Sequence, residues 1–188
     1  MDDVLLIHRV LAGDREAFAG LVQAHHARIL RLCASLLEDP VLAEDAAQEI
    51  FLKAYQQLAA FRGQSAFSTW LYRIASNHCL DLLRKRRRER TESWDALVEE
   101  SGEPLQEAGI ASRDPAAVLA KTELVQRALA SLPPDYRLIL TLREVEGLSY
   151  EELASALRCS LDAVKARLRR SRRQLLDHLR HFLGEGSV

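Results

Sequence analysis

Apolar residues recur at helical spacing along nearly the whole chain, and this periodicity restricts the possible folds more than any other feature. Strand-like alternation is scarce, and only five Pro and eight Gly interrupt the 188 residues. In the stretch 61–90, for example, the helix face that the pattern predicts to be buried carries Phe67, Leu71, Ile74, His78 and Leu82. We therefore predict an all-α protein.

Breaks in this pattern divide the chain into two small helical domains joined by a linker. The N-terminal domain is predicted over residues 1–90. The C-terminal domain is predicted over residues 115–188 and starts near the helix-start pair Asp114-Pro115. The intervening residues 91–114 contain Gly and Pro, lose helical periodicity and are rich in acidic side chains, which is typical of a flexible linker.

The formal net charge of −1 hides a strong asymmetry along the chain. Residues 82–90 carry six bases and one acid, and residues 158–180 carry eight bases and two acids. Between them, residues 91–120 carry seven acids and one base. Two local basic patches on a nearly neutral chain can bind nucleic acid there without making the protein a general polyanion binder.

Several classes of protein are disfavoured. No apolar run approaches the ~18 residues that a membrane span needs, and the acidic, amphipathic N-terminus is unlike a secretory signal, so we expect a cytoplasmic protein without membrane insertion. The chain has no carboxylate cluster, nucleophile motif or Gly-rich phosphate loop. We therefore expect no enzymatic activity, no catalytic residues and no cofactor.

The three cysteines, Cys33, Cys79 and Cys159, are far apart in sequence and odd in number, which argues against a disulfide framework. No CxxC pair is present for zinc, so no metal site is expected. His178 and His181 lie three residues apart on a predicted helix, which leaves redox or metal sensing as an alternative.

A helix predicted from Pro40 to about Leu58 begins with an N-cap, Asp39, followed by proline at the first helical position. Small and apolar residues occupy one of its faces. The opposite face carries Asp45, Gln48, Glu49 and Leu52. A leucine on an acidic, amide-bearing face suits a protein partner better than solvent. The alternative is a solvated face with one stray leucine.

The stretch 61–90 combines a short turn, aromatic rings and a run of cations. Its turn and unburied helix face carry Arg62, Ser65, Thr69, Arg73 and Asn77. Aromatic rings stack on unpaired bases, amides bond base edges and arginines hold phosphates. We interpret the stretch as a nucleic-acid surface, the alternative being a core helix with a solvated basic end.

The C-terminal domain contains a helix-turn-helix signature. Ser149-x-x-Glu152 is a capping box for a helix from Tyr150 to Leu157. A turn over residues 158–160 leads into a long helix from Leu161 to about Leu183, whose apolar anchors are Val164, Leu168, Ser171 and Leu175. The candidate DNA-contacting residues on that helix are Lys165, Ala166, Arg167, Arg169, Arg170 and Arg173.

Six segments, in this order and spacing, resemble one protein family. They are Gly13-Asp14-x-x-Ala17-Phe18, residues 43–55 (AEDAAQEIFLKAY), residues 61–77 (FRGQSAFSTWLYRIASN), Leu132-Pro133-Pro134-Asp135-x-Arg137, residues 146–154 (EGLSYEELA) and Val164-Lys165-Ala166-Arg167-Leu168-x-Arg170. Over nearly its whole length the chain resembles an extracytoplasmic-function (ECF) sigma factor of bacterial RNA polymerase, a branch of the sigma-70 family.

The resemblance implies a role for each candidate surface. Core polymerase would be bound by Asp45, Gln48, Glu49 and Leu52. A flipped base of the −10 promoter element would be captured by the segment that contains Phe61, Arg62, Ser65, Phe67, Thr69, Trp70, Arg73 and Asn77. The −35 element would be read as duplex DNA by Lys165, Ala166, Arg167, Arg169, Arg170 and Arg173.

Within the −10 segment, Phe67 lies on the buried stripe, so we expect it to shape the turn rather than to touch a base. The turn from Arg62 to Ser65 and the side chain of Asn77 are predicted to form a pocket for one flipped base. The implied partners are core RNA polymerase (its clamp and flap regions), promoter DNA and an inhibitory anti-sigma factor. The acidic linker would pass through the polymerase toward the RNA path.

The sequence departs from the family pattern at several positions, among them Arg169 and Arg173, which are more basic than expected. Arg158 stands where a small, flexible residue usually follows the first helix of the helix-turn-helix. Ala163 and Ala166 replace common hydroxyl residues, which puts hydroxyl contacts to DNA in doubt. The alternative function is a dimeric helix-turn-helix regulator that binds an operator, but it would leave the helix 40–58 face and the turn after Phe61 unexplained.

Overall fold

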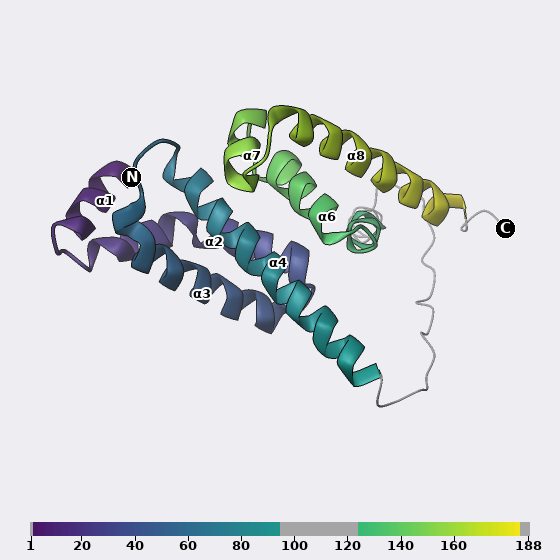
Figure 1. Cartoon of the computed structure of the whole chain (residues 1–188), viewed down its shortest axis with the longest axis horizontal. Helices are drawn as coiled ribbons and strands as arrows, with labels where there is room; N and C mark the ends of the chain where they lie inside the picture. Colours follow the sequence, from purple (N-terminus) through teal and green to yellow (C-terminus); the bar gives the residue numbers. More distant parts are fainter. Residues whose placement is uncertain (1, 95–123, 185–188) are drawn as a thin grey trace, which may run out of the picture.

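The computed structural model describes residues 2–94 and 124–184, which we call the first half and the second half (Figure 1). All regular structure in these two ranges is helical, which confirms the predicted fold class. Among these helices, none combines the length and the apolar character that a membrane-spanning segment needs.

The first half is a bundle in which α2 packs against α1, α3 and α4. Its elements are α1 (Asp3–Leu11), α2 (Ala17–Leu37), α3 (Pro40–Gln57), the short 3-10 helix η1 (Leu58–Ala60) and α4 (Phe67–Trp94). Figure 1 shows α4 continuing well beyond the other helices of this bundle.

Helix α3 begins where the sequence predicts because Asp39 satisfies its first free amide groups. The Asp39 carboxylate accepts from the backbone N–H groups of Val41 (3.0 Å) and Leu42 (3.2 Å). Its predicted apolar face is buried, and the small side chains on it let α3 lie close to its neighbours. The buried residues are Ala43, Ala46, Ala47, Ile50, Phe51 and Ala54.

Helix α4 buries the predicted stripe, of which Phe67, Leu71, Ile74 and His78 are buried and Leu82 is half-buried. It continues to Trp94, so the first residues of the predicted linker 91–114 are helical. Regular hydrogen bonding persists beyond the point where the hydrophobic pattern stops, because a helix needs no apolar face to continue for another turn. The rest of that linker, 95–114, lies outside the described residues.

The second half consists of four helical elements after the helical residues 124–130. They are α6 (Pro134–Leu140), the π-helical turn η2 (Thr141–Val145), α7 (Tyr150–Leu157) and α8 (Leu161–Gly184). The helix predicted from residue 116 is described only from 124. The helix predicted from Pro134 to Val145 changes to π geometry in its last turn, where the Glu146 N–H donates to the Thr141 carbonyl (3.1 Å).

The helix-turn-helix is confirmed, with its capping box in place. The Ser149 hydroxyl accepts from the Glu152 N–H (3.1 Å), and the Glu152 carboxylate accepts from the Ser149 N–H (2.7 Å). At the end of α7, Arg158 adopts a left-handed conformation (φ 50°, ψ 49°) that lets the next N–H bond the Ala154 carbonyl (3.1 Å). The turn therefore forms without the expected small residue.

Cys33 and Cys79, which are far apart in sequence, lie together in the core of the first half. The thiol of Cys79 donates to Cys33 across 3.7 Å, and both side chains are fully buried. The hydrogen bond with Cys79 and burial raise the pKa of the Cys33 thiol. Because the thiolate is the reactive form, burial and the raised pKa of Cys33 both disfavour its reaction in the folded protein.

The structure bears on the metal-sensing alternative through the grouping of possible ligands in the described residues. No group of three or more His, Cys, Asp or Glu side chains in residues 2–94 and 124–184 could hold a metal ion. His178 is instead engaged in packing the second half, since its Nδ1 lies 2.5 Å from the Ser131 hydroxyl.

Replacing Arg158 by glycine should stabilise the fold by about 1 kcal/mol, because glycine enters the left-handed region without the Cβ clash that arginine pays there. The free energy of unfolding from denaturant titration measures this. Arg158→Ala is the matched control, since it removes the same guanidinium but keeps Cβ. Equal stabilities for the two variants would show that backbone strain at this turn is negligible.

Of the three thiols, only Cys159 should react readily with a thiol reagent in the native protein, because it alone is partly exposed. Cys33 and Cys79 should react only at the rate at which the protein unfolds. Mass spectrometry after brief alkylation at neutral pH distinguishes the sites. Rapid labelling of Cys33 or Cys79 in the folded protein would revive the redox-sensing alternative.

Candidate functional site

The polar face of α3 forms a continuous stripe on the surface. Asp45, Gln48, Glu49 and Leu52 follow one another at the i, i+3, i+4 and i+7 spacing of neighbours on a helix, and all four are exposed. Leu52 is 56% exposed although the remainder of its helix buries its apolar residues well. The predicted polymerase-binding residues are therefore placed together and free to touch a partner.

A histidine from α4 supports this stripe from behind. The Lys53 ammonium donates to His78 Nδ1 (2.6 Å), and His78 Nε2 lies 3.5 Å from the Glu49 carboxylate, which Lys53 also approaches at 3.7 Å. Burial and the Lys53 charge lower the pKa of His78, so its ring is neutral at pH 7. The ring therefore lies behind Glu49 and accepts from Lys53, a placement that reading His78 as a core residue did not reveal.

The aromatic residues of the predicted −10 segment form a cluster that is mostly buried. Phe61 contacts Phe67 and Trp70 with ring centroids 5.8 and 5.4 Å apart, and Phe67 and Trp70 are almost inaccessible. His25 of α2 packs edge-on against Phe67 (5.4 Å) and is bonded to Asp3 of α1 (2.9 Å). These rings support the turn from within, and only Phe61 is half-buried.

The polar residues of that segment fall into two groups. Arg62, Asn77 and, in part, Ser65 are accessible to a ligand, and Gly63 takes a positive φ of 67° that lets the chain turn there. At 1.5 Å per residue, Asn77 lies about 15 Å along α4 from its first residue. If the turn from Arg62 to Ser65 and the side chain of Asn77 are to touch the same base, the turn must fold back along α4. The shared pocket stays a prediction.

Thr69 and Arg73 face the second half, which corrects the prediction that Thr69 lies on an unburied face. Thr69 is 1% exposed, and its hydroxyl lies 3.5 Å from the Glu152 carboxylate of α7. Burial and the nearby charge of Arg158 lower the pKa of Arg73. Because the covering helix comes from the other half, the periodicity of α4 alone gave no sign of it.

The predicted −35 residues lie on α8, whose buried residues Val164, Leu168 and Ser171 face the second half. Exposed positions are Lys165, Arg169, Arg170 and Arg173, and half-buried positions are Ala166 and Arg167. The basic face is therefore accessible, and long cationic side chains on such a face suit phosphate and guanine contacts.

Sequence reasoning missed three residues beside this face. Tyr150, Arg172 and Arg180 line a groove with Lys165 and other cations of α8. Arg172 is fixed by the Glu144 carboxylate (2.6 Å), and the Arg143 guanidinium lies over the Tyr150 ring at 5.0 Å. The available signal was that Arg172 and Arg180 lie within the basic patch 158–180.

Family models match both halves of the chain. Residues 21–89 match Sigma-70 region 2, and residues 122–175 match Sigma-70 region 4. The chain is 39% identical to the RNA polymerase sigma-H factor of Pseudomonas aeruginosa, over 97% of this chain and 96% of that protein. It is 38% identical to the ECF RNA polymerase sigma-E factor of Escherichia coli K12, over 92% and 91%.

Solved structures with the same fold include chains from two protein complexes. One is the sigma factor RpoE with the anti-sigma factor NepR from Bartonella quintana, which has a TM-score of 0.66 and 28% identity over 87% of this chain and 96% of that one. The other is CnrH with the cytosolic domain of CnrY, at a TM-score of 0.67 and 26% identity over 95% and 97%.

The matched regions, the near full-length relatives and the helix-turn-helix agree. The chain belongs to the ECF sigma factors, and its function is to direct RNA polymerase to promoters for the initiation of transcription.

Proposed function

We propose that three separate surfaces of the chain contribute to promoter-specific initiation. The α3 stripe (Asp45, Gln48, Glu49 and Leu52) docks on the clamp of core polymerase. The segment from Phe61 to Asn77 captures the −10 element, and the basic face of α8 reads the −35 element. The observation that carries the proposal is the exposed Leu52 within an ordered acidic stripe, because a regulator that binds only DNA has no use for that surface.

The energetics require the polymerase as a partner. Opening the duplex costs about 1–2 kcal/mol per base-pair step, and extruding a base costs a few more. Stacking returns about 1–3 kcal/mol per base, and phosphate contacts add a salt-dependent contribution. Since the buried Phe67 and Trp70 offer little stacking area, this chain cannot melt a promoter alone, and free DNA binding should be weak.

Further partners follow from the relatives. The RpoE structure contains an anti-sigma factor, and we infer that an inhibitory protein of this kind also binds this chain, where it would cover the polymerase- and DNA-binding surfaces. The flap of the polymerase is the proposed contact of the second half. Because core polymerase and promoter DNA are cytoplasmic in bacteria, we propose that the protein acts in the cytoplasm. The second candidate, an operator-binding dimer, would support no initiation in run-off transcription with core polymerase.

Replacing Leu52 by alanine should weaken binding to core polymerase by about tenfold or more, since burying a leucine contributes about 1.5–3 kcal/mol. Its exposure means that stability should not change. The control is Leu5→Ala on α1, which removes another exposed leucine, 60% accessible, outside the stripe. Fluorescence titration with core enzyme measures both affinities, and equal affinities would remove α3 from the docking surface.

Replacing Asn77 by alanine should lower open-complex formation by about tenfold and leave polymerase binding unchanged, because a base-edge contact contributes about 1–3 kcal/mol. Gln23→Ala on α2 removes an exposed amide elsewhere and is the control. Permanganate footprinting of promoter DNA reports the opening. A loss of polymerase binding together with melting would reject the assignment of Asn77 to DNA.

A further inference from the structure

The C-terminal part of α4 carries a run of cations that none of the three surfaces above uses. We call residues 84–88 the basic end of α4. All five side chains are exposed, and they are Arg84, Lys85, Arg86, Arg87 and Arg88. Leu82 and Leu83, both half-buried, are the last apolar residues before them. The basic end therefore follows the last packing of α4 on the bundle, and Figure 1 shows α4 projecting beyond the other helices there.

This run of cations opposes the stability of its own helix. Like charges three or four positions apart on a helix repel, and each such pair costs about 0.2–0.5 kcal/mol. Arg84 is placed in this way relative to Arg87 and Arg88, and Lys85 is so placed relative to Arg88. A solvated helix is more stable when the two signs of charge alternate along its surface. A negatively charged partner explains the basic end better than the stability of α4 does.

Carboxylates on α4 itself engage two of these cations. Asp81 pairs with Arg84 at 2.8 Å, and Glu89 approaches Lys85 at 3.8 Å. All four side chains are more than half exposed. Ion pairs in such positions contribute about 0–1 kcal/mol, so phosphate groups can replace them at little cost.

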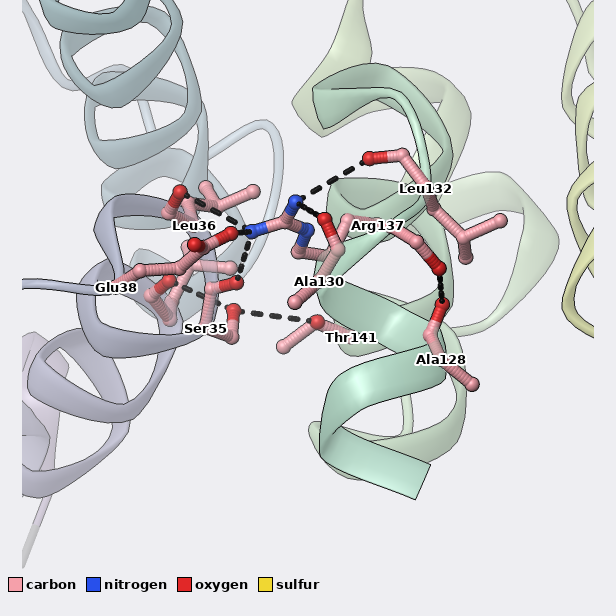
Figure 2. A network of polar contacts seen from close by, with 10 residues as sticks. Ser35, Leu36, Glu38, Ala128, Ala130, Leu132, Arg137 and Thr141 are labelled. Atoms are coloured by element: carbon pink, nitrogen blue, oxygen red, sulfur yellow. Dashed lines mark hydrogen bonds and ion pairs between the residues drawn. The ribbon is translucent and has the colours of Figure 1, made fainter. Parts of the chain in front are cut away.

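The corner between α2 and α3 carries two consecutive acids, and both are already engaged. Asp39 accepts from the first amides of α3 and approaches Arg86 only at 3.8 Å. Glu38 accepts from the guanidinium of Arg137, which also donates to the Ser35 carbonyl (3.3 Å). Figure 2 shows the Glu38 carboxylate turned toward that guanidinium. This corner therefore adds little negative charge to the basic end.

One helix carries both the basic end and the proposed −10 segment, which fixes the distance between them. At 1.5 Å per residue, the basic end lies about 10–17 Å along α4 beyond Asn77. Base pairs of a duplex are about 3.4 Å apart, so this span corresponds to about three to five base pairs. Aromatic and amide groups suit unpaired bases, whereas arginine and lysine suit the phosphates of a duplex. The two parts of α4 therefore match two adjacent states of DNA.

We propose that the basic end of α4 is a further DNA site, which holds backbone phosphates of the duplex immediately upstream of the −10 element. The −10 element itself is opened, so the duplex that adjoins it toward the −35 element is the spacer. The chain that leaves α4 leads to the helix-turn-helix proposed to read the −35 element. The inference rests on the proposed −10 role of α4 and adds a contact that carries no sequence information.

The test uses Lys85→Gln/Arg88→Gln in the full chain, because glutamine keeps a high helix propensity and removes both charges. Each phosphate contact contributes about 0.9 to the slope of log Kobs against log salt concentration. Holoenzyme assembled with this variant should therefore bind promoter DNA with a slope about two smaller than the wild type gives. Fluorescence anisotropy over a series of KCl concentrations measures the slope on a promoter that supports run-off transcription by the wild type.

Arg9→Gln/Arg15→Gln is the matched control, since it removes the same charge from two exposed positions outside α4. It should leave the slope unchanged, as should Lys85→Arg/Arg88→Lys, which keeps both charges. Circular dichroism checks that each variant is folded. Equal slopes for the two glutamine variants would overturn the phosphate contact. A lower affinity of Lys85→Gln/Arg88→Gln for core polymerase without DNA would assign the basic end to the polymerase and would also overturn the proposal.

The position on the DNA is tested with neutral methylphosphonate linkages three to five base pairs upstream of the melted region, whose edge permanganate footprinting locates. They should weaken binding of the wild-type holoenzyme by about two- to tenfold, the range for one or two exposed charge pairs. Lys85→Gln/Arg88→Gln should be unaffected, because it has already lost these contacts. An equal effect on both proteins would overturn the placement at the spacer. Failure of the −10 role is seen separately, as unaltered promoter opening by Asn77→Ala.

Discussion

Helix α4 is packed from two sides, and the rest of the structure depends on this constraint. Its stripe of Phe67, Leu71, Ile74 and His78 completes the core of the first half, and Thr69 and Tyr72 on another side meet the second half. The same helix carries the residues proposed to capture the −10 element. The Tyr72 hydroxyl donates to the Glu146 carboxylate of the second half (2.6 Å), so the packing between the halves and the proposed DNA surface share one helix.

The three surfaces differ in how the fold treats them. The α3 stripe and the α8 basic face are exposed on helices that are anchored by buried apolar residues, so both are ready for a partner. The −10 segment rests on a buried cluster of aromatic side chains, and its accessible groups are Arg62 and Asn77. A weak grip on a few bases suits a protein that relies on the polymerase to hold the surrounding DNA, because the cost of melting exceeds what these contacts return.

Features governed by nearby residues could be predicted from the sequence. Asp39 caps α3 and Ser149 forms the capping box of α7, since each acts within three residues. Features that join distant segments could not. The pairing of Cys33 with Cys79, the contact of Lys53 with His78 and the burial of Thr69 under α7 all require knowing which helices meet. The turn at Arg158 forms although its left-handed conformation costs about 1 kcal/mol, because packing elsewhere in the helix-turn-helix outweighs that cost.

The central claim is that the exposed stripe of α3 docks this chain on core polymerase and that the docked chain then initiates transcription at promoters. Run-off transcription with purified core polymerase tests it most directly, with the wild type and Leu52→Ala compared over a range of protein concentrations. The wild type should give a promoter-specific transcript, and Leu52→Ala should need about tenfold more protein to give the same amount. No transcript from the wild type, or identical titrations for the two proteins, would contradict the claim.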